Sequence, residues 1–262
     1  MRYNSSMLFG KGQFEVARVW GVPICLDLSL ILMAVIFVFR AGNIFWGLTS
    51  AAILLASVLL HELGHTAVAL SYGCRVRDIT LLLLGGRATL VDMPRGPWRE
   101  AWMAAAGPLV SLLLGISGFF FSRLAPYGSW LGFICWYLQY VNFSLLVFNL
   151  IPAFPMDGGR IFRALLESRL GRPRATLIAY RVAQVLAGCM ALWAVFRGFD
   201  FILLLIAYFV FTSSRAEYEM VRLESRYGYG YGGYGGPGDD SVVISPPPYG
   251  TRDEVTDIFK ER

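Results

Sequence analysis

Two histidines and a glutamate lie within one helical turn of this sequence. His61 and His65 are the only histidines among the 262 residues, and Glu62 directly follows the first of them. Residues four positions apart lie on the same face of a helix, so both imidazoles can bind one metal ion. A glutamate at the second position of such a motif can deprotonate a water molecule that the metal activates. The spacing therefore indicates a hydrolytic metal centre.

The alternative is that these residues belong to a packed core, as two hydrogen-bonded histidines beside a buried glutamate. The surrounding run, Phe45–Leu70, is otherwise strongly apolar. Ionisable groups inside an apolar membrane helix are costly and mark functional sites by default. The metal site is therefore the favoured interpretation.

A tetrahedral catalytic zinc takes three protein ligands and one water, so two histidines leave one ligand to be found. A carboxylate or thiolate must supply it, and Asp157 is the best candidate. Pro152 and Pro155 precede Asp157 and break the helix before it, and non-helical backbone at membrane depth is tolerated only where protein or a water-filled cavity covers it. The alternative is that Asp157 caps a helix that begins at Gly158. The four cysteines are scattered and are expected to be small buried hydrophobic residues: Cys25, Cys74, Cys135 and Cys189.

The composition places these residues in a membrane. Hydrophobic residues make up 56% of the chain and charged residues 16%, and the mean hydropathy is +0.55. A spanning helix needs about 20 apolar residues. The sequence therefore predicts an all-α polytopic membrane protein with about six transmembrane helices, over Val22–Phe39, Phe45–Leu70, Trp98–Phe121, Trp130–Ile151, Leu177–Phe196 and Phe199–Thr212.

Two further segments differ from these spans. Residues 73–97 are too polar to span, but they contain the β-branched and apolar run Ile79–Leu84, followed by Gly85-Gly86. This pattern favours a short β-hairpin or re-entrant segment at the membrane edge, where the glycines would let another backbone approach; the alternative is an interfacial loop. Residues 1–214 are expected to form the membrane domain, with no cleavable signal peptide, and residues 215–262 a disordered Tyr/Gly- and Pro-rich tail.

The charge distribution predicts the orientation. Of the 23 basic residues, all but Arg40, Arg123 and Arg197 fall in the loops and termini on one side of the six predicted spans. The positive-inside rule then puts both termini in the cytoplasm. Because topology explains the net charge of +5, nucleic acid is not an expected partner.

Together these motifs resemble the site-2 protease family of intramembrane zinc metalloproteases. The resemblance extends over roughly residues 15–215. It rests on the His61–His65 motif in a transmembrane helix, on Asn149, Pro152, Asp157 and Gly158 downstream, and on Gly85-Gly86 and Ala106-Gly107-Pro108 between them. Met156 stands where leucine is usual in the family.

The resemblance implies a role for each of these residues. His61, His65 and Asp157 would bind one Zn²⁺ per chain, Glu62 would be the general base, and Asn149 would steady the scissile carbonyl or its oxyanion. Gly85 and Gly86 would receive an unwound substrate strand. The substrate would be a transmembrane protein, such as an anti-sigma factor or a membrane-tethered regulator, cleaved near the cytosolic end of its helix in the lipid of a prokaryotic plasma membrane. The chain has room for neither of the family's frequent PDZ and CBS domains.

Two other functions compete with this one. A transporter would use the broken helix as an ion or solute site, but it would be expected to carry corresponding breaks in two halves. A zinc-binding membrane scaffold without catalysis would have no need of Glu62.

Overall fold

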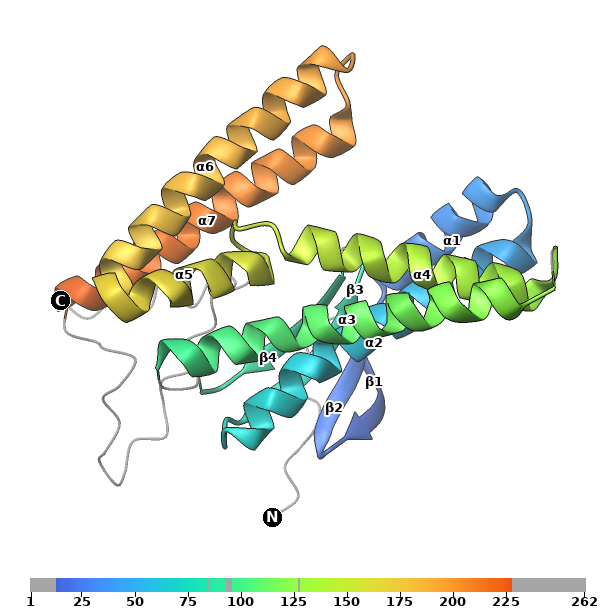
Figure 1. The fold of residues 1–262 in the computed structure, drawn as a ribbon, viewed down its shortest axis with the longest axis horizontal. Coiled ribbons are helices and arrows are strands. Elements are labelled where there is room, and N and C mark those ends of the chain that lie inside the picture. The colour runs from blue at the N-terminus through green and yellow to red at the C-terminus, as the bar shows by residue number, and fades with distance from the viewer. Residues whose placement is uncertain (1–12, 84, 93–95, 127, 228–262) are drawn as a thin grey trace. The chain divides into compact units, whose positions relative to one another are not determined.

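The computed structural model describes residues 13–83, 85–92, 96–126 and 128–227. In that part of the chain, helices dominate and four strands form one sheet (Figure 1). The elements are β1 (Gln13–Val19), β2 (Val22–Asp27), α1 (Ser29–Ala41), α2 (Ile44–Ser71), β3 (Val76–Leu82), β4 (Gly85–Leu90), α3 (Pro97–Leu124), α4 (Trp130–Asn149), α5 (Asp157–Leu170), α6 (Arg172–Phe196) and α7 (Phe201–Tyr227).

The described residues fall into two units. The first contains residues 13–92 and Trp102–Asn149, and therefore the sheet, α1, α2, α4 and most of α3. The second contains residues 96–101 and 150–227, and therefore α5, α6, α7 and the first turn of α3.

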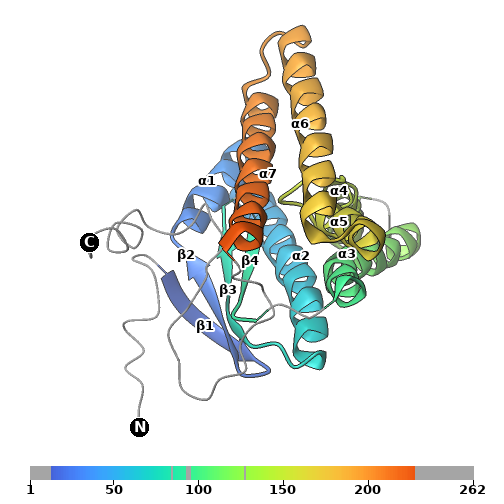
Figure 2. The ribbon, with the colours of Figure 1, turned by 90° about the vertical axis from the view of Figure 1, so that its left-hand side faces the viewer.

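The sheet of the first unit has the strand order β1-β2-β3-β4. The predicted hairpin over residues 73–97 is confirmed as β3 and β4, which pair antiparallel with Leu82 opposite Gly85. Strands β1 and β2 were not predicted; β2 pairs parallel to β3, with Ile24 opposite Ile79. In Figure 2 this sheet lies alongside α2, whose residues contact both β3 and β4. The sheet therefore ends at β4, next to the helix that carries the histidines.

The predicted span Val22–Phe39 is wrong as a single helix. Its first part is strand β2, and α1 begins only at Ser29, where the Asp27 carboxylate accepts a hydrogen bond from the Ser29 backbone N–H. The β-branched Val22 and Ile24 around Pro23 favour the extended backbone. Helix α1 has 13 residues, fewer than the roughly 20 that a perpendicular span needs.

Among the described residues, five helices are long and apolar enough to cross a membrane, namely α2, α3, α4, α6 and α7. About six spans are predicted from the sequence; the structure has these five and the shorter apolar helix α1. Helices α6 and α7 of the second unit pack against each other as a hairpin. Helix α7 continues to Tyr227, past the predicted end of the membrane domain at residue 214, because Arg215–Tyr227 is rich in helix-forming Ala, Glu, Met and Arg. The remaining predicted tail, residues 228–262, lies outside the described residues.

Helix α2 has clear ends that place its motif. The Asn43 side chain caps its start by accepting hydrogen bonds from the backbone N–H groups of Phe45 and Trp46. After its last residue, Gly73 adopts a positive φ of 77°, which reverses the chain toward β3. The His61–His65 motif therefore lies well inside α2, beside the sheet edge.

Candidate metal centre

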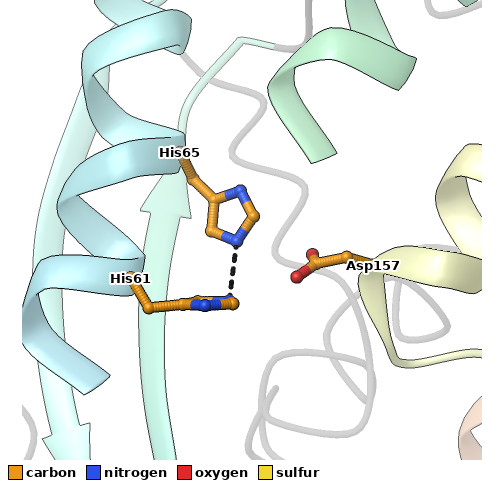
Figure 3. Close-up of side chains that lie close together, drawn as sticks. All are labelled: His61, His65 and Asp157. Atoms are coloured by element: carbon orange, nitrogen blue, oxygen red, sulfur yellow. Dashed lines mark hydrogen bonds between the residues drawn. The ribbon is translucent and has the colours of Figure 1, made fainter. Parts of the chain in front are cut away.

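His61 and His65 occupy consecutive turns of one face of α2, and their rings converge (Figure 3). The Nε2 atoms of the two rings are 3.2 Å apart, and His61 is buried. Two nitrogens bound to one tetrahedral zinc lie about 3.3 Å apart, because each Zn–N bond is about 2.0–2.1 Å long. The pair therefore has the geometry for two ligands of one zinc ion, as the motif predicts.

Helix α3 packs directly against this histidine pair. A Cβ atom built on Gly107 would collide with the Nε2 atoms of both rings, and one built on Gly64 would lie 2.9 Å from the Ala106 carbonyl oxygen. Glycine is therefore required at both positions for the two helices to approach. Part of the resemblance to the site-2 protease family rests on Ala106-Gly107-Pro108. The close approach of α2 and α3 is the physical reason for glycine in this segment.

The Nδ1 atoms of the two rings point to partners on α3. His65 Nδ1 lies 2.8 Å from the Met103 carbonyl oxygen, and His61 Nδ1 lies 2.9 Å from Ser111 Oγ. Sequence reasoning missed both partners. Together with Gly107, the partner positions 103 and 111 form a stripe with a spacing of four residues on one face of α3. This spacing is the signal in the sequence from which the two partners could have been found.

Glu62 lies between the histidines in sequence and against the end strand of the sheet in space. Its side chain is half-buried, and a Cβ built on Gly86 of β4 would lie 2.5 Å from Glu62 Cγ. The absence of a side chain at Gly86 thus lets the β4 backbone reach the carboxylate-bearing side chain. Gly85 begins β4 with a φ of 133°, which glycine adopts without strain. Glu62 and Gly86 therefore lie in contact within the first unit, and Glu62 is on the helix that carries His61 and His65.

Asn149 is the last residue of α4 and is half-exposed. Its Nδ2 atom donates a hydrogen bond to the Leu145 carbonyl oxygen of its own helix at 3.0 Å. An amide nitrogen carries two hydrogens, so a second donor remains on this group.

Asp157 is the first residue of α5 in the second unit, half-buried, and is drawn with the histidines in Figure 3. The helix cap is Met156, which makes no side-chain capping hydrogen bond, so the alternative of Asp157 as the cap of a helix beginning at Gly158 is not what the structure shows. The helix N-terminus favours a negative charge at this position.

The two glycines after Asp157 explain how α5 starts where it does. A Cβ on Gly158 would collide with the Leu150 carbonyl oxygen, and a Cβ on Gly159 would lie 2.6 Å from the Ala153 carbonyl carbon. The segment that the prolines break therefore folds back onto the first turn of α5. This packing fixes the position of the Asp157 backbone within the second unit.

The second unit also contains a buried ionic network that sequence reasoning interpreted only as topology-setting charge. The fully buried Arg163 of α5 pairs with Glu100 at the start of α3 and with Glu217 of α7, and Arg172 lies 3.3 Å from Glu100. Burial opposes the charge on Arg163, but the two carboxylates outweigh it and raise the pKa of this guanidinium above its ordinary value. The network ties α5 to its neighbours within the unit.

The chain is similar to known zinc metalloproteases. The family model described as peptidase family M50 matches residues 49–127 and 123–192. A zinc metalloprotease of Methanocaldococcus jannaschii is 37% identical over 79% of this chain and 61% of its own length, and stage IV sporulation protein FB of Bacillus subtilis is 27% identical over 55% and 49%.

Among solved structures, the site-2 protease from Methanocaldococcus jannaschii is similar to this chain with a TM-score of 0.59 and 34% identity. The match covers 79% of this chain and 95% of that one. The chain thus spans between about half and three fifths of the length of these two curated relatives, but nearly all of the solved structure. The relatives named as zinc metalloproteases indicate Zn²⁺ as the metal that fits the histidine pair.

Proposed function

Because the chain belongs to peptidase family M50, we propose that it is an intramembrane zinc endopeptidase. The proposed reaction is hydrolysis of a peptide bond within, or near the cytosolic end of, a transmembrane helix of another protein. The observation that carries the proposal is the convergence of His61 and His65, with their Nε2 atoms 3.2 Å apart, beside a glutamate packed against the terminal strand of a sheet.

In this proposal His61, His65 and Asp157 hold the zinc. Each of the three side chains offers one ligand atom, and two imidazoles with one carboxylate are a usual donor set for a catalytic zinc. When bound, zinc polarises the scissile carbonyl and lowers the pKa of water to about 7. Glycines 158 and 159 support the role of Asp157 by fixing its backbone at the start of α5.

Glu62 and Asn149 act on the reacting groups in this proposal. The Glu62 carboxylate takes a proton from the attacking water and delivers it to the nitrogen of the leaving amine, so that it ends the cycle unchanged. Asn149 donates its second amide hydrogen to the oxygen on which negative charge develops. The half-buried setting of both residues leaves room for a substrate to reach them.

The substrate enters as an extended strand in this proposal. A helix hides its peptide bonds in hydrogen bonds within the helix, so the cleaved segment must unwind first. Strand β4 ends the sheet order, and a peptide that adds to it at Gly85 and Gly86 replaces the lost helical hydrogen bonds. Because Gly86 contacts the Glu62 side chain, such a peptide would lie beside the proposed base.

The chain is an integral membrane protein, and its basic residues support the proposed orientation. Arg40 and Arg123 lie in the last turns of α1 and α3, and Arg197 follows α6, whereas Arg99, Arg172 and Arg174 lie in the first turns of α3 and α6. In this proposal both termini lie in the cytoplasm, and the chain spans a prokaryotic plasma membrane. The proposed partner is a membrane protein such as an anti-sigma factor or a membrane-tethered regulator.

The proposal is tested with purified protein in detergent, zinc and a model transmembrane substrate. Glu62→Gln is expected to keep its zinc, by elemental analysis, and to abolish cleavage, because the amide cannot accept the proton. Glu219→Gln, a change of an exposed glutamate on α7, serves as the matched control and is expected to cleave normally. Cleavage by Glu62→Gln would overturn the mechanism, and wild-type protein with zinc but no cleavage of any transmembrane substrate would favour the scaffold or transporter alternatives.

A further inference from the structure

In the stripe of α3 that faces the histidine pair, Ser111 bonds to an imidazole through its side chain, whereas Met103 does so through its main chain. Ser111 is fully buried, and its Oγ lies 2.9 Å from His61 Nδ1. The other contacts of this stripe come from the Met103 main-chain carbonyl and from Gly107, which has no side chain. Ser111 is therefore the position at which a substitution can remove a partner of the histidine pair and leave the backbone contacts in place.

The two Nδ1 partners differ in what they can do. A carbonyl oxygen only accepts hydrogen bonds, so His65 Nδ1 is the donor to it, and in the neutral ring His65 Nε2 then keeps its lone pair. A serine hydroxyl can either donate or accept a hydrogen bond. When Ser111 accepts from His61 Nδ1–H, His61 has its proton on Nδ1 and its lone pair on Nε2, as His65 does. Both Nε2 lone pairs are then directed at the same point, which is the condition for binding one metal ion.

Other serines in these helices show that the Ser111 geometry is specific. Ser117 of α3 and Ser144 of α4 donate their hydroxyls to the carbonyl oxygens of residues 113 and 140, one turn earlier in their own helices. Such local bonds are the usual way to satisfy a serine in a helix. Ser111 instead places its oxygen against a ring nitrogen of another helix, at the distance of a good hydrogen bond.

We propose that Ser111 is a positioning residue for zinc, which accepts a hydrogen bond from His61 Nδ1 and thereby holds the His61 ring with Nε2 toward the metal. This inference rests on the zinc site of the proposed function and adds a residue to it. Groups that orient a metal-bound imidazole in this way typically change metal affinity about 10–100-fold when they are removed.

The test is a competition between the purified full chain and a zinc chelator. Ser111→Ala is expected to bind Zn²⁺ about 10–100-fold more weakly than the wild type. Ser57→Ala is the matched control, because Ser57 is an equally buried serine of α2 whose hydroxyl bonds to Asn142 instead of a histidine. Its zinc affinity is expected to stay within a factor of two of the wild type.

A second readout separates positioning from loss of structure. Protein loaded with Co²⁺ is expected to show shifted visible absorption bands in Ser111→Ala but not in Ser57→Ala, because the bands report the ligand geometry. Ser111→Thr, which keeps a hydroxyl, is expected to restore most of the affinity and the bands. Unchanged zinc affinity in Ser111→Ala, or equal losses in both alanine variants, would overturn this inference, whereas wild-type protein that binds no zinc would overturn the proposed function as well.

Discussion

The two units hold the proposed zinc ligands by different physical means. In the first unit, His61 and His65 are oriented by neutral hydrogen-bond partners and by glycine at close contacts with α3. In the second unit, the helix that carries Asp157 is fixed by a buried network of charges around Arg163. Neutral partners leave the Nε2 lone pairs of the imidazoles available to a metal. The buried charge network opposes movement of α5, because each charge would lose its partner if the helix moved.

The largest expected effect comes from adding one methyl group to the contact between α2 and α3. Gly107→Ala is expected to abolish zinc binding and cleavage, because its Cβ would lie only 2.6 Å from His61 Nε2 and closer still to His65 Nε2. Gly188→Ala is the control in α6 of the second unit, where a Cβ would meet no atom within 4 Å. That variant is expected to bind zinc normally and to gain up to about 0.5–1 kcal/mol of stability. Normal zinc content in Gly107→Ala would show that the two helices do not need this contact.

The next largest effect is expected from replacing Arg163, the central cation of the buried ionic network. Arg163→Met leaves Glu100 and Glu217 without their buried partner and is expected to destabilise the protein by about 3–5 kcal/mol, measured by thermal unfolding in detergent. Arg222→Met removes a cation of the exposed ion pair with Glu219 on α7 and is expected to cost less than about 1 kcal/mol. Equal melting temperatures for the two variants would contradict the role assigned to the buried network.

The smallest expected effect comes from an exposed pair in the first unit. Arg75 donates a hydrogen bond to the Asp92 carboxylate at 2.8 Å, and this bond lowers the Asp92 pKa. Because the pKa is lower in the folded state, the contribution is full above the ordinary Asp pKa of about 3.9 and is lost as the pH falls below it. Arg75→Ala is expected to cost about 0–1 kcal/mol at pH 7 and nothing at low pH. A loss of stability in Arg75→Ala that does not depend on pH would exclude the ion pair as the cause of that loss.

Much of the membrane part could be predicted because apolar length and proline breaks are local signals. The spans corresponding to α2, α3 and α4 and the β3-β4 hairpin follow from residue types that need no partner to be recognised. Strand β2 was missed because its apolar residues continue into α1. The boundary between them is marked by Asp27, whose carboxylate accepts a hydrogen bond from the Ser29 backbone N–H. Helix α7 extends further than hydropathy suggests, because its last turns are polar but still helix-forming.

The candidate centre likewise has a part that the sequence predicts and a part that depends on tertiary contacts. The motif on α2 predicts its own geometry, since the helix repeat places the two histidines together. The roles of Ser111 and the Met103 carbonyl depend on which face of α3 meets α2, which is a tertiary contact that hydropathy does not encode. Likewise, the residues around Arg163 in the sequence do not show that this arginine is buried and paired, and not one of the exposed basic residues that set the membrane topology.

The most direct test of the central claim is the zinc content of the purified wild-type chain and of Asp157→Ala after identical dialysis. We expect one zinc per wild-type chain and a clearly lower occupancy in the variant, because the histidine pair alone leaves the site one protein ligand short. Wild-type protein without zinc would contradict the account, and equal zinc in both proteins would remove Asp157 from the ligand set.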